Sequence, residues 1–84
     1  MKIEVVGSAE DVAGFALAGL PGRVAETGKD VEAALRAAVA GDGEPAGFLL
    51  VSAGAARLAP DLFDALEERD AAPVVLSLPE EMSP

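Results

Sequence analysis

The stretch Lys2-Ile3-Glu4-Val5-Val6-Gly7-Ser8-Ala9-Glu10-Asp11-Val12-Ala13-Gly14-Phe15-Ala16-Leu17-Ala18-Gly19-Leu20 decides the fold of this chain. Residues 3–6 form a short, β-branched run that ends at a glycine, which predicts a buried first strand. Ser8 can accept a hydrogen bond from the backbone N–H of Glu10 or Asp11, so it is expected to cap a helix with an acidic first turn. Gly19, followed closely by a proline, predicts the end of that helix.

The rest of the chain continues the same alternation of strands and helices. Strands are predicted at residues 23–26, 48–51 and 74–78, the first of them at a sheet edge and the second central, covered on both faces, with Leu50 buried. Asp30 is expected to cap a second helix, whose apolar face is Val31, Ala34, Leu35, Ala38 and Val39. A third helix is predicted from Pro60 to Arg69, after a loop or single helical turn at residues 54–59, with Leu62, Phe63 and Leu66 inward.

This order predicts an α/β domain with a four-stranded parallel sheet and three helices. The expected strand order is 2-1-3-4, as in flavodoxin-like and Rossmann-like domains, with strands one and three in the centre. We expect residues 1–79 to form this single domain, with turns at 41–45 and 70–73 and a short acidic tail at 80–84.

Composition excludes several classes of function. The chain has 84 residues, a formal net charge of −9, and neither Cys nor His. A disulfide framework and a thiolate zinc site are therefore excluded, and the commonest general base is absent. The negative charge disfavours nucleic acid, and no apolar run is long enough to span a bilayer. We expect a cytoplasmic protein with no metal, no cofactor and no insertion into the membrane.

Ligands of such sheets bind beyond the carboxyl ends of the central strands, where Gly7 and Ser8 meet Ser52. A phospho-receiver domain would need an Asp after the third strand and a Lys after the fourth, and this chain has Ser52-Ala53 and Leu78-Pro79 there. Backbone N–H groups at Gly7 and Ser8 could hold a small anion. The sequence thus predicts no catalytic residue, and leaves a degenerate receiver-like or anion-binding module as an alternative to a structural or regulatory subunit.

The first helix resembles that of the F subunit of the V-type/A-type rotary ATPases, which has a "GFRLAG"-like motif. The matching residues are Gly7, Gly14, Phe15, Leu17, Ala18, Gly19 and Leu20, whereas Ala16 stands where the family usually has Arg. Residues 48–52 are similar to the family's "ALILI" strand, and residues 73–79 to its proline-bounded fourth strand.

This resemblance implies a non-catalytic subunit of the central stalk. Family members bind the coiled-coil D subunit within the rotary ATPase and help couple ATP hydrolysis or synthesis to ion movement, so a cytoplasmic position peripheral to the membrane is implied. They usually continue after the fourth strand with a C-terminal helix, which residues 80–84 do not supply. The residues expected at the partner interface are Phe15, Leu17, Ala18 and Leu20, although a phenylalanine such as Phe15 is more often a core residue than a binding anchor.

Overall fold

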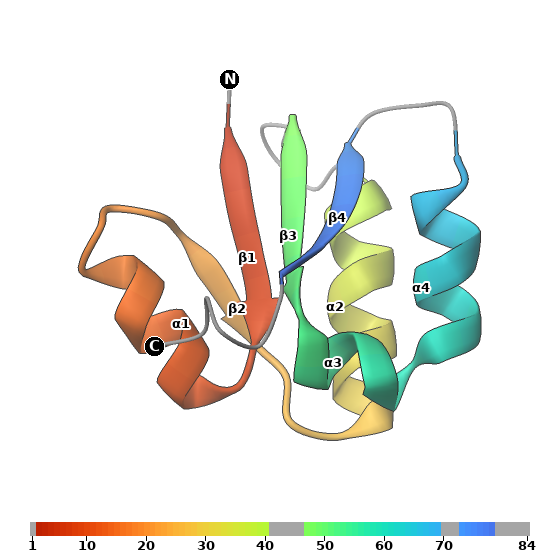
Figure 1. Ribbon diagram of the computed structural model, residues 1–84, viewed down its shortest axis with the longest axis horizontal. Coiled ribbons are helices and arrows are strands. Elements are labelled where there is room, and N and C mark those ends of the chain that lie inside the picture. The colour runs from red at the N-terminus through yellow and green to blue at the C-terminus, as the bar shows by residue number, and fades with distance from the viewer. Residues whose placement is uncertain (1, 41–46, 70–72, 79–84) are drawn as a thin grey trace.

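The computed structural model describes residues 2–40, 47–69 and 73–78. Helices and strands follow one another along the chain (Figure 1) as β1 (Ile3–Gly7), α1 (Ala9–Ala16), β2 (Gly22–Val24), α2 (Gly28–Ala40), β3 (Phe48–Ser52), α3 (Ala53–Leu58), α4 (Pro60–Glu67) and β4 (Val74–Leu78). The predicted turn at residues 41–45, most of the predicted turn at 70–73 and the predicted tail at 80–84 lie outside the described residues.

The four strands form one parallel sheet in the order β2-β1-β3-β4. Parallel neighbours require a crossover segment, and α1, α2 and the α3–α4 pair supply one after each of the first three strands. This confirms the predicted fold class and strand order, with the first and third strands in the centre. The short β2 lies at one edge, as predicted, and β4 lies at the other.

The strand register divides the side chains between two faces of the sheet, because residues paired across neighbouring strands point to the same side. Val6 pairs with Val51, and Leu49 pairs with Val75. These four side chains are buried in one cluster with the apolar sides of α2, α3 and α4, including Val31, Leu35, Ala38, Ala55, Phe63 and Leu66. This side of the sheet, termed the α2 face, holds the main core.

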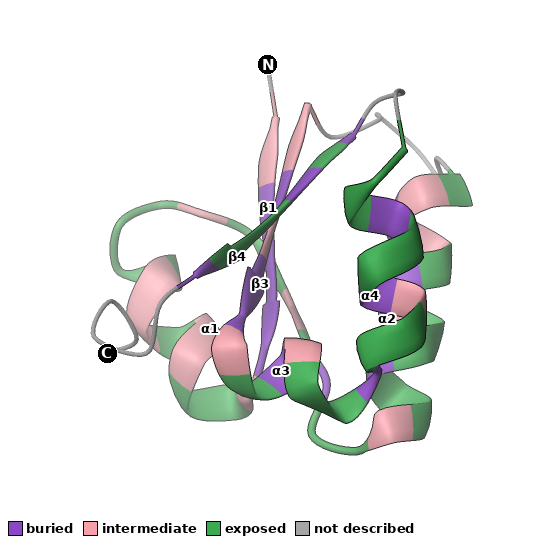
Figure 2. Ribbon diagram, turned by 45° about the vertical axis from the view of Figure 1, so that its right-hand side comes forward, coloured by how far each residue is buried: buried purple, intermediate pink, exposed green. Residues whose placement is uncertain are grey.

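The opposite side, termed the α1 face, carries Ile3, Val5, Phe48, Leu50, Val74 and Leu76. Helix α1 packs over β1 and β2 on this side. Its approach is so close that a Cβ on Gly22 would lie 2.9 Å from Cγ1 of Val12, which explains a glycine at this strand position. Figure 2 shows the burial along the sheet, with β1 largely buried and much of β4 exposed.

The prediction that the third strand is covered on both faces was wrong. Leu49 and Val51 are fully buried, but Leu50 and Phe48 are only partly buried. The reason is that α1 packs on β1 and β2, so the α1 face has less cover at β3 and β4. Leu50 therefore does not lie in the main core, where Leu49 lies instead.

Two details of the helices also differ from expectation. Helix α2 begins at Gly28 because Thr27, not Asp30, caps it: Thr27 Oγ1 accepts the backbone N–H of Asp30 at 3.1 Å. Residues 53–58 form a six-residue helix, so the described part of the chain has four helices rather than three. A proline disfavours helical backbone in the residue before it, and Ala59, with φ −141° and ψ 61°, separates α3 from α4 at Pro60.

Candidate functional site at the carboxyl edge of the sheet

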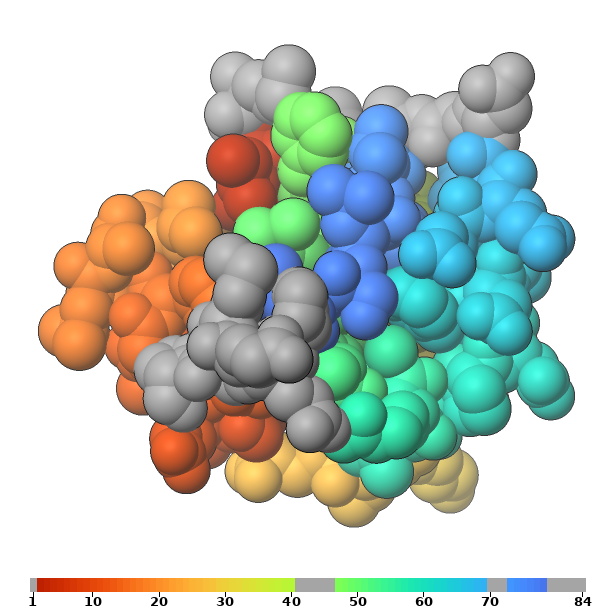
Figure 3. Space-filling view, in the orientation of Figure 1, coloured from red at the N-terminus to blue at the C-terminus, as the bar shows by residue number. Residues whose placement is uncertain are grey.

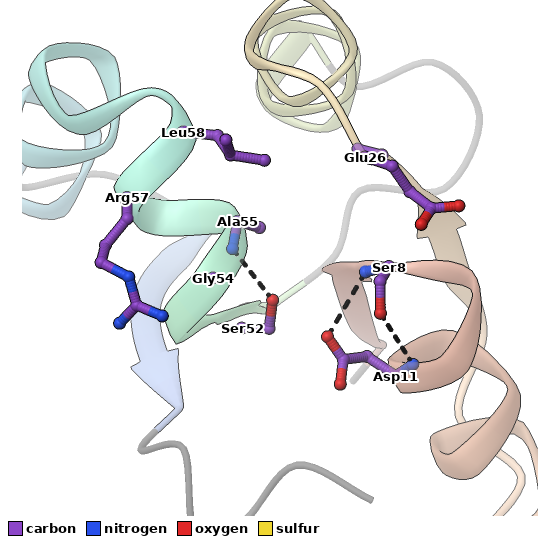
Figure 4. Close-up of a pocket in the computed structure, with 9 residues that line it drawn as sticks. Ser8, Asp11, Glu26, Ser52, Gly54, Ala55, Arg57 and Leu58 are labelled. Atoms are coloured by element: carbon purple, nitrogen blue, oxygen red, sulfur yellow. Dashed lines mark hydrogen bonds between the residues drawn. The ribbon is translucent and has the colours of Figure 1, made fainter.

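A pocket of about 350 Å³ lies beyond the carboxyl ends of β1 and β3 (Figure 4). This is the place where sheets of this topology bind ligands, and the sequence predicted that Ser8 and Ser52 would meet there. Both line the pocket, which confirms their proximity. The other lining residues are Asp11, Ala25, Glu26, Gly54, Ala55, Arg57 and Leu58.

The first polar group of the pocket is the N-terminus of α1, which is capped by side chains of its own first turn. Ser8 Oγ accepts the backbone N–H of Asp11 at 3.2 Å, and Asp11 Oδ2 accepts the backbone N–H of Ser8 at 3.4 Å. This is a capping box, in which the first turn of the helix satisfies its own free donors. The predicted cap at Ser8 is thereby confirmed, with Asp11 rather than Glu10 as its partner.

The second polar group is Ser52, which is buried at the end of β3. Its Oγ accepts the backbone N–H of Ala55 at 3.2 Å and so caps α3. Gly7 lies between the two serine caps, and a Cβ added to it would meet Asp11 Oδ2 at 3.0 Å and Ser52 Oγ at 3.1 Å. The glycine at this position allows β1 and β3 to place both caps at one edge of the sheet.

The charges around the pocket are mixed. Asp11 is engaged in the capping box, while Glu26 and Arg57 stand on opposite sides of the pocket (Figure 4). The anion site proposed at Gly7 and Ser8 stays a prediction, and the Asp11 carboxylate already takes the hydrogen bond that Ser8 N–H would offer to an anion. Across residues 2–40, 47–69 and 73–78, no group of three or more Asp, Glu, His or Cys side chains is placed to hold a metal ion.

The four predicted interface residues lie elsewhere, at the end of α1. The backbone N–H of Leu20 donates to the Phe15 carbonyl and that of Gly19 donates to the Ala16 carbonyl, with φ of 84° at Gly19. This pattern is a Schellman motif, in which a glycine in left-handed conformation ends the helix. We term Phe15, Leu17, Ala18 and Leu20 the α1 corner. Phe15 and Leu20 are half-buried, Ala18 is exposed, and Leu17 is 92% exposed.

Sequence reasoning missed a polar cluster at the edge of the α2 face. Glu4, only 7% exposed, receives a hydrogen bond of 2.9 Å from Arg23 Nε and lies 3.8 Å from Lys2 Nζ. A glutamate inside an otherwise apolar strand was the available signal, because a buried carboxylate needs a cationic partner. The pair joins β1 to the edge strand β2, so its role is structural.

Comparison with known proteins assigns most of the chain to one family. Residues 3–84 match the family model described as "ATP synthase (F/14-kDa) subunit". A search of curated proteins found no match. Among the helices that the structure describes, none has the length and apolar character required to cross a membrane.

Proposed function

The chain belongs to the ATP synthase F/14-kDa subunit family, as part of an ATP synthase complex, and from this we propose that it is a non-catalytic component of the central stalk of a V/A-type rotary ATPase. In this role it binds the coiled-coil D subunit of the stalk and supports the coupling of ATP hydrolysis or synthesis to ion transport. The family match over residues 3–84 is the observation that carries the proposal.

The geometry of the pocket supports the non-catalytic part of this proposal. Its two hydroxyl groups and the Asp11 carboxylate are engaged as helix caps. A catalytic nucleophile requires a neighbouring base within hydrogen-bond reach, and Ser8 and Ser52 each accept from a backbone N–H at the start of a helix instead. The polar groups at this edge thus serve to hold the strands and helices together.

The α1 corner supports the partner-binding part of the proposal. Leu17 is a large apolar side chain held almost wholly in solvent, next to a helix end whose backbone is restrained by the Schellman hydrogen bonds. Because the backbone here is already ordered, a partner that covers Leu17 has to order only the side chain. The α1 corner is therefore the contact that we propose for the coiled-coil D subunit, which would hold the protein on the cytoplasmic side, peripheral to the membrane.

The test is reconstitution with the coiled-coil D subunit encoded in the same genome. We expect co-expression to yield a one-to-one complex that survives size-exclusion chromatography at micromolar concentration. Leu17→Asp should weaken the complex by roughly tenfold or more, since it replaces a buried apolar contact by a charge. Glu10→Gln, an exposed position earlier on α1, is the matched control and should leave binding unchanged. Partners that elute separately would overturn the proposal.

A further inference from the structure

Residues 8–24, from the capping serine of α1 to the end of β2, contribute no residue to the buried core. None of them is buried, whereas Val5, Val6 and Ala25 on either side of them are. The main core cluster likewise includes no residue from this stretch. Figure 3 shows it at one edge of the molecule, on the side away from α4. We term residues 8–24 the α1–β2 segment.

The two elements of this segment are held to each other. Helix α1 begins with the capping box and ends with the Schellman motif described above. Val12 of α1 packs so closely on β2 that there is no room for a Cβ at Gly22. Helix α1 has only eight residues, which is too short to persist in water without a surface to pack on. We therefore expect α1 and β2 to leave β1 together, and α1 to lose its helical structure when they do.

Strand pairing and one ion pair join the segment to β1. The three residues of β2 pair with β1, and the Val5 backbone N–H donates to the Pro21 carbonyl at 3.0 Å. The side chain of Arg23 adds the hydrogen bond of 2.9 Å to Glu4. Because β2 is an edge strand, the segment can detach while the pairs of β1 with β3 and of β3 with β4 stay intact.

Parts of a protein with few buried apolar side chains open at a lower free energy than its core does. We propose that the α1–β2 segment opens and closes as one unit while the core on the α2 face stays folded, and that the Glu4–Arg23 ion pair holds it closed. Opening uncovers one edge of β1 and the apolar side chain of Val5, over which α1 packs. The opened form is a minor state, so global unfolding stays cooperative.

This opening has a consequence for the binding of a partner. The α1 corner belongs to the α1–β2 segment, since all four of its residues lie within residues 8–24. A partner that covers the α1 corner binds the closed form, so binding should slow the opening. The consequence rests on the proposed function for the identity of the partner, whereas the opening itself does not.

Native-state hydrogen exchange of the full chain, followed by NMR at urea concentrations below the unfolding transition, tests the opening. The amides of Val12, Leu20 and Ala25 report on the segment and its attachment, and those of Leu35 and Val51 report on the core. We expect the segment amides to exchange about 100-fold faster than the core amides, with one shared and weaker dependence on urea. Equal protection of both sets, or segment amides that exchange one by one without dependence on urea, would overturn the proposal.

Substitutions separate the segment from the core. Arg23→Ala removes the ion pair and should speed the exchange of all segment amides by about 10-fold. Arg36→Ala removes an exposed cation from α2 and is the matched control, which should leave them unchanged. Val75→Ala weakens the core near the opposite edge of the sheet, so only the core amides should exchange faster. Segment amides that respond to Val75→Ala as strongly as the core amides, or that ignore Arg23→Ala, would contradict the proposal.

The same amides, measured with the purified coiled-coil D subunit in excess, test the consequence for binding. We expect the segment amides to slow together by about 10-fold or more, and Leu17→Asp to abolish the effect. A complex whose segment amides exchange as fast as those of the free chain would refute the link between binding and closing. A D subunit that does not bind would refute the proposed function and this link with it, while exchange in the isolated chain would still decide whether the segment opens.

Discussion

Helices cover the two faces of the sheet to different degrees. On the α2 face, three helices bury Val6, Leu49 and Val51 fully. On the α1 face, α1 is the one helix of residues 2–40, 47–69 and 73–78 that packs on the sheet, over β1 and β2, and Val74 and Leu76 of β4 are exposed. The difference shows that a chain of this size can concentrate its core on one side of a parallel sheet. Stability is expected to depend mainly on the α2 face, which leaves the other face available for binding.

The largest effect should come from Leu49→Ala on the α2 face. Leu49 is fully buried in the centre of the core, so its truncation leaves a cavity and should cost about 3 kcal/mol of unfolding free energy. Urea denaturation followed by circular dichroism would measure the loss. A cost below about 1 kcal/mol would show that the α2 face does not dominate stability.

A smaller loss is expected for Arg23→Ala, at the polar edge of the α2 face. The substitution leaves the nearly buried Glu4 carboxylate with only Lys2, 3.8 Å away. Since Arg23 is itself about one-third exposed, we expect a cost of about 1–2 kcal/mol rather than that of a fully buried pair. The double variant Arg23→Ala/Glu4→Leu removes the stranded charge and should regain stability in the same denaturation assay. No recovery would mean that the charge is not the cause.

Leu50→Ala compares the two faces most directly, because Leu50 neighbours Leu49 on the same strand. Its side chain is only partly buried, on the α1 face. We expect a cost of about 1 kcal/mol, well below that of Leu49→Ala. The two variants should be measured side by side. Equal costs would show that the α1 face is as well covered as the α2 face.

The smallest effect is expected for Leu76→Thr, on the exposed α1 face of β4. Threonine suits an edge strand, and Leu76 is 43% exposed, so the change should stay within about 0.5 kcal/mol by thermal or urea unfolding. A large destabilisation would mean that the isolated domain already buries this side chain.

The sequence predicted the features that depend on residues close together in the chain better than those that depend on tertiary packing. Local patterns located all four strands, the apolar side of α2, the cap at Ser8 and the helix start at Pro60, since each depends on nearby residues. The burial of Leu50 was wrong because it depends on which strands α1 reaches, a tertiary fact that strand composition does not contain. Asp30 was mistaken for a cap because Thr27, three residues earlier, serves better in the actual backbone.

The position of the candidate site could be predicted from the sequence, but the hydrogen bonds made by its polar groups could not. Strand order alone placed Ser8 and Ser52 together, because the ends of neighbouring parallel strands meet at one edge. The hydrogen bond from the Ser8 backbone N–H to the Asp11 carboxylate was not predictable, because it depends on the geometry of the first helical turn. The exposure of Leu17 was likewise not predictable, because it depends on the positive φ of Gly19, where the helix ends.

The pairing of β1 with β3 also determines how the chain can fold. Residues 3–6 find their central partner only at residues 48–51, so the ribosome releases β1, α1, β2 and α2 before the strand that completes the sheet. Until then one edge of β1 has no neighbour and the apolar side of α2 has no full surface to cover. Long-range pairing of this kind makes folding slow relative to helical bundles. The first half of the chain is therefore not a folding unit, and the domain should form in one cooperative step after β3 has emerged.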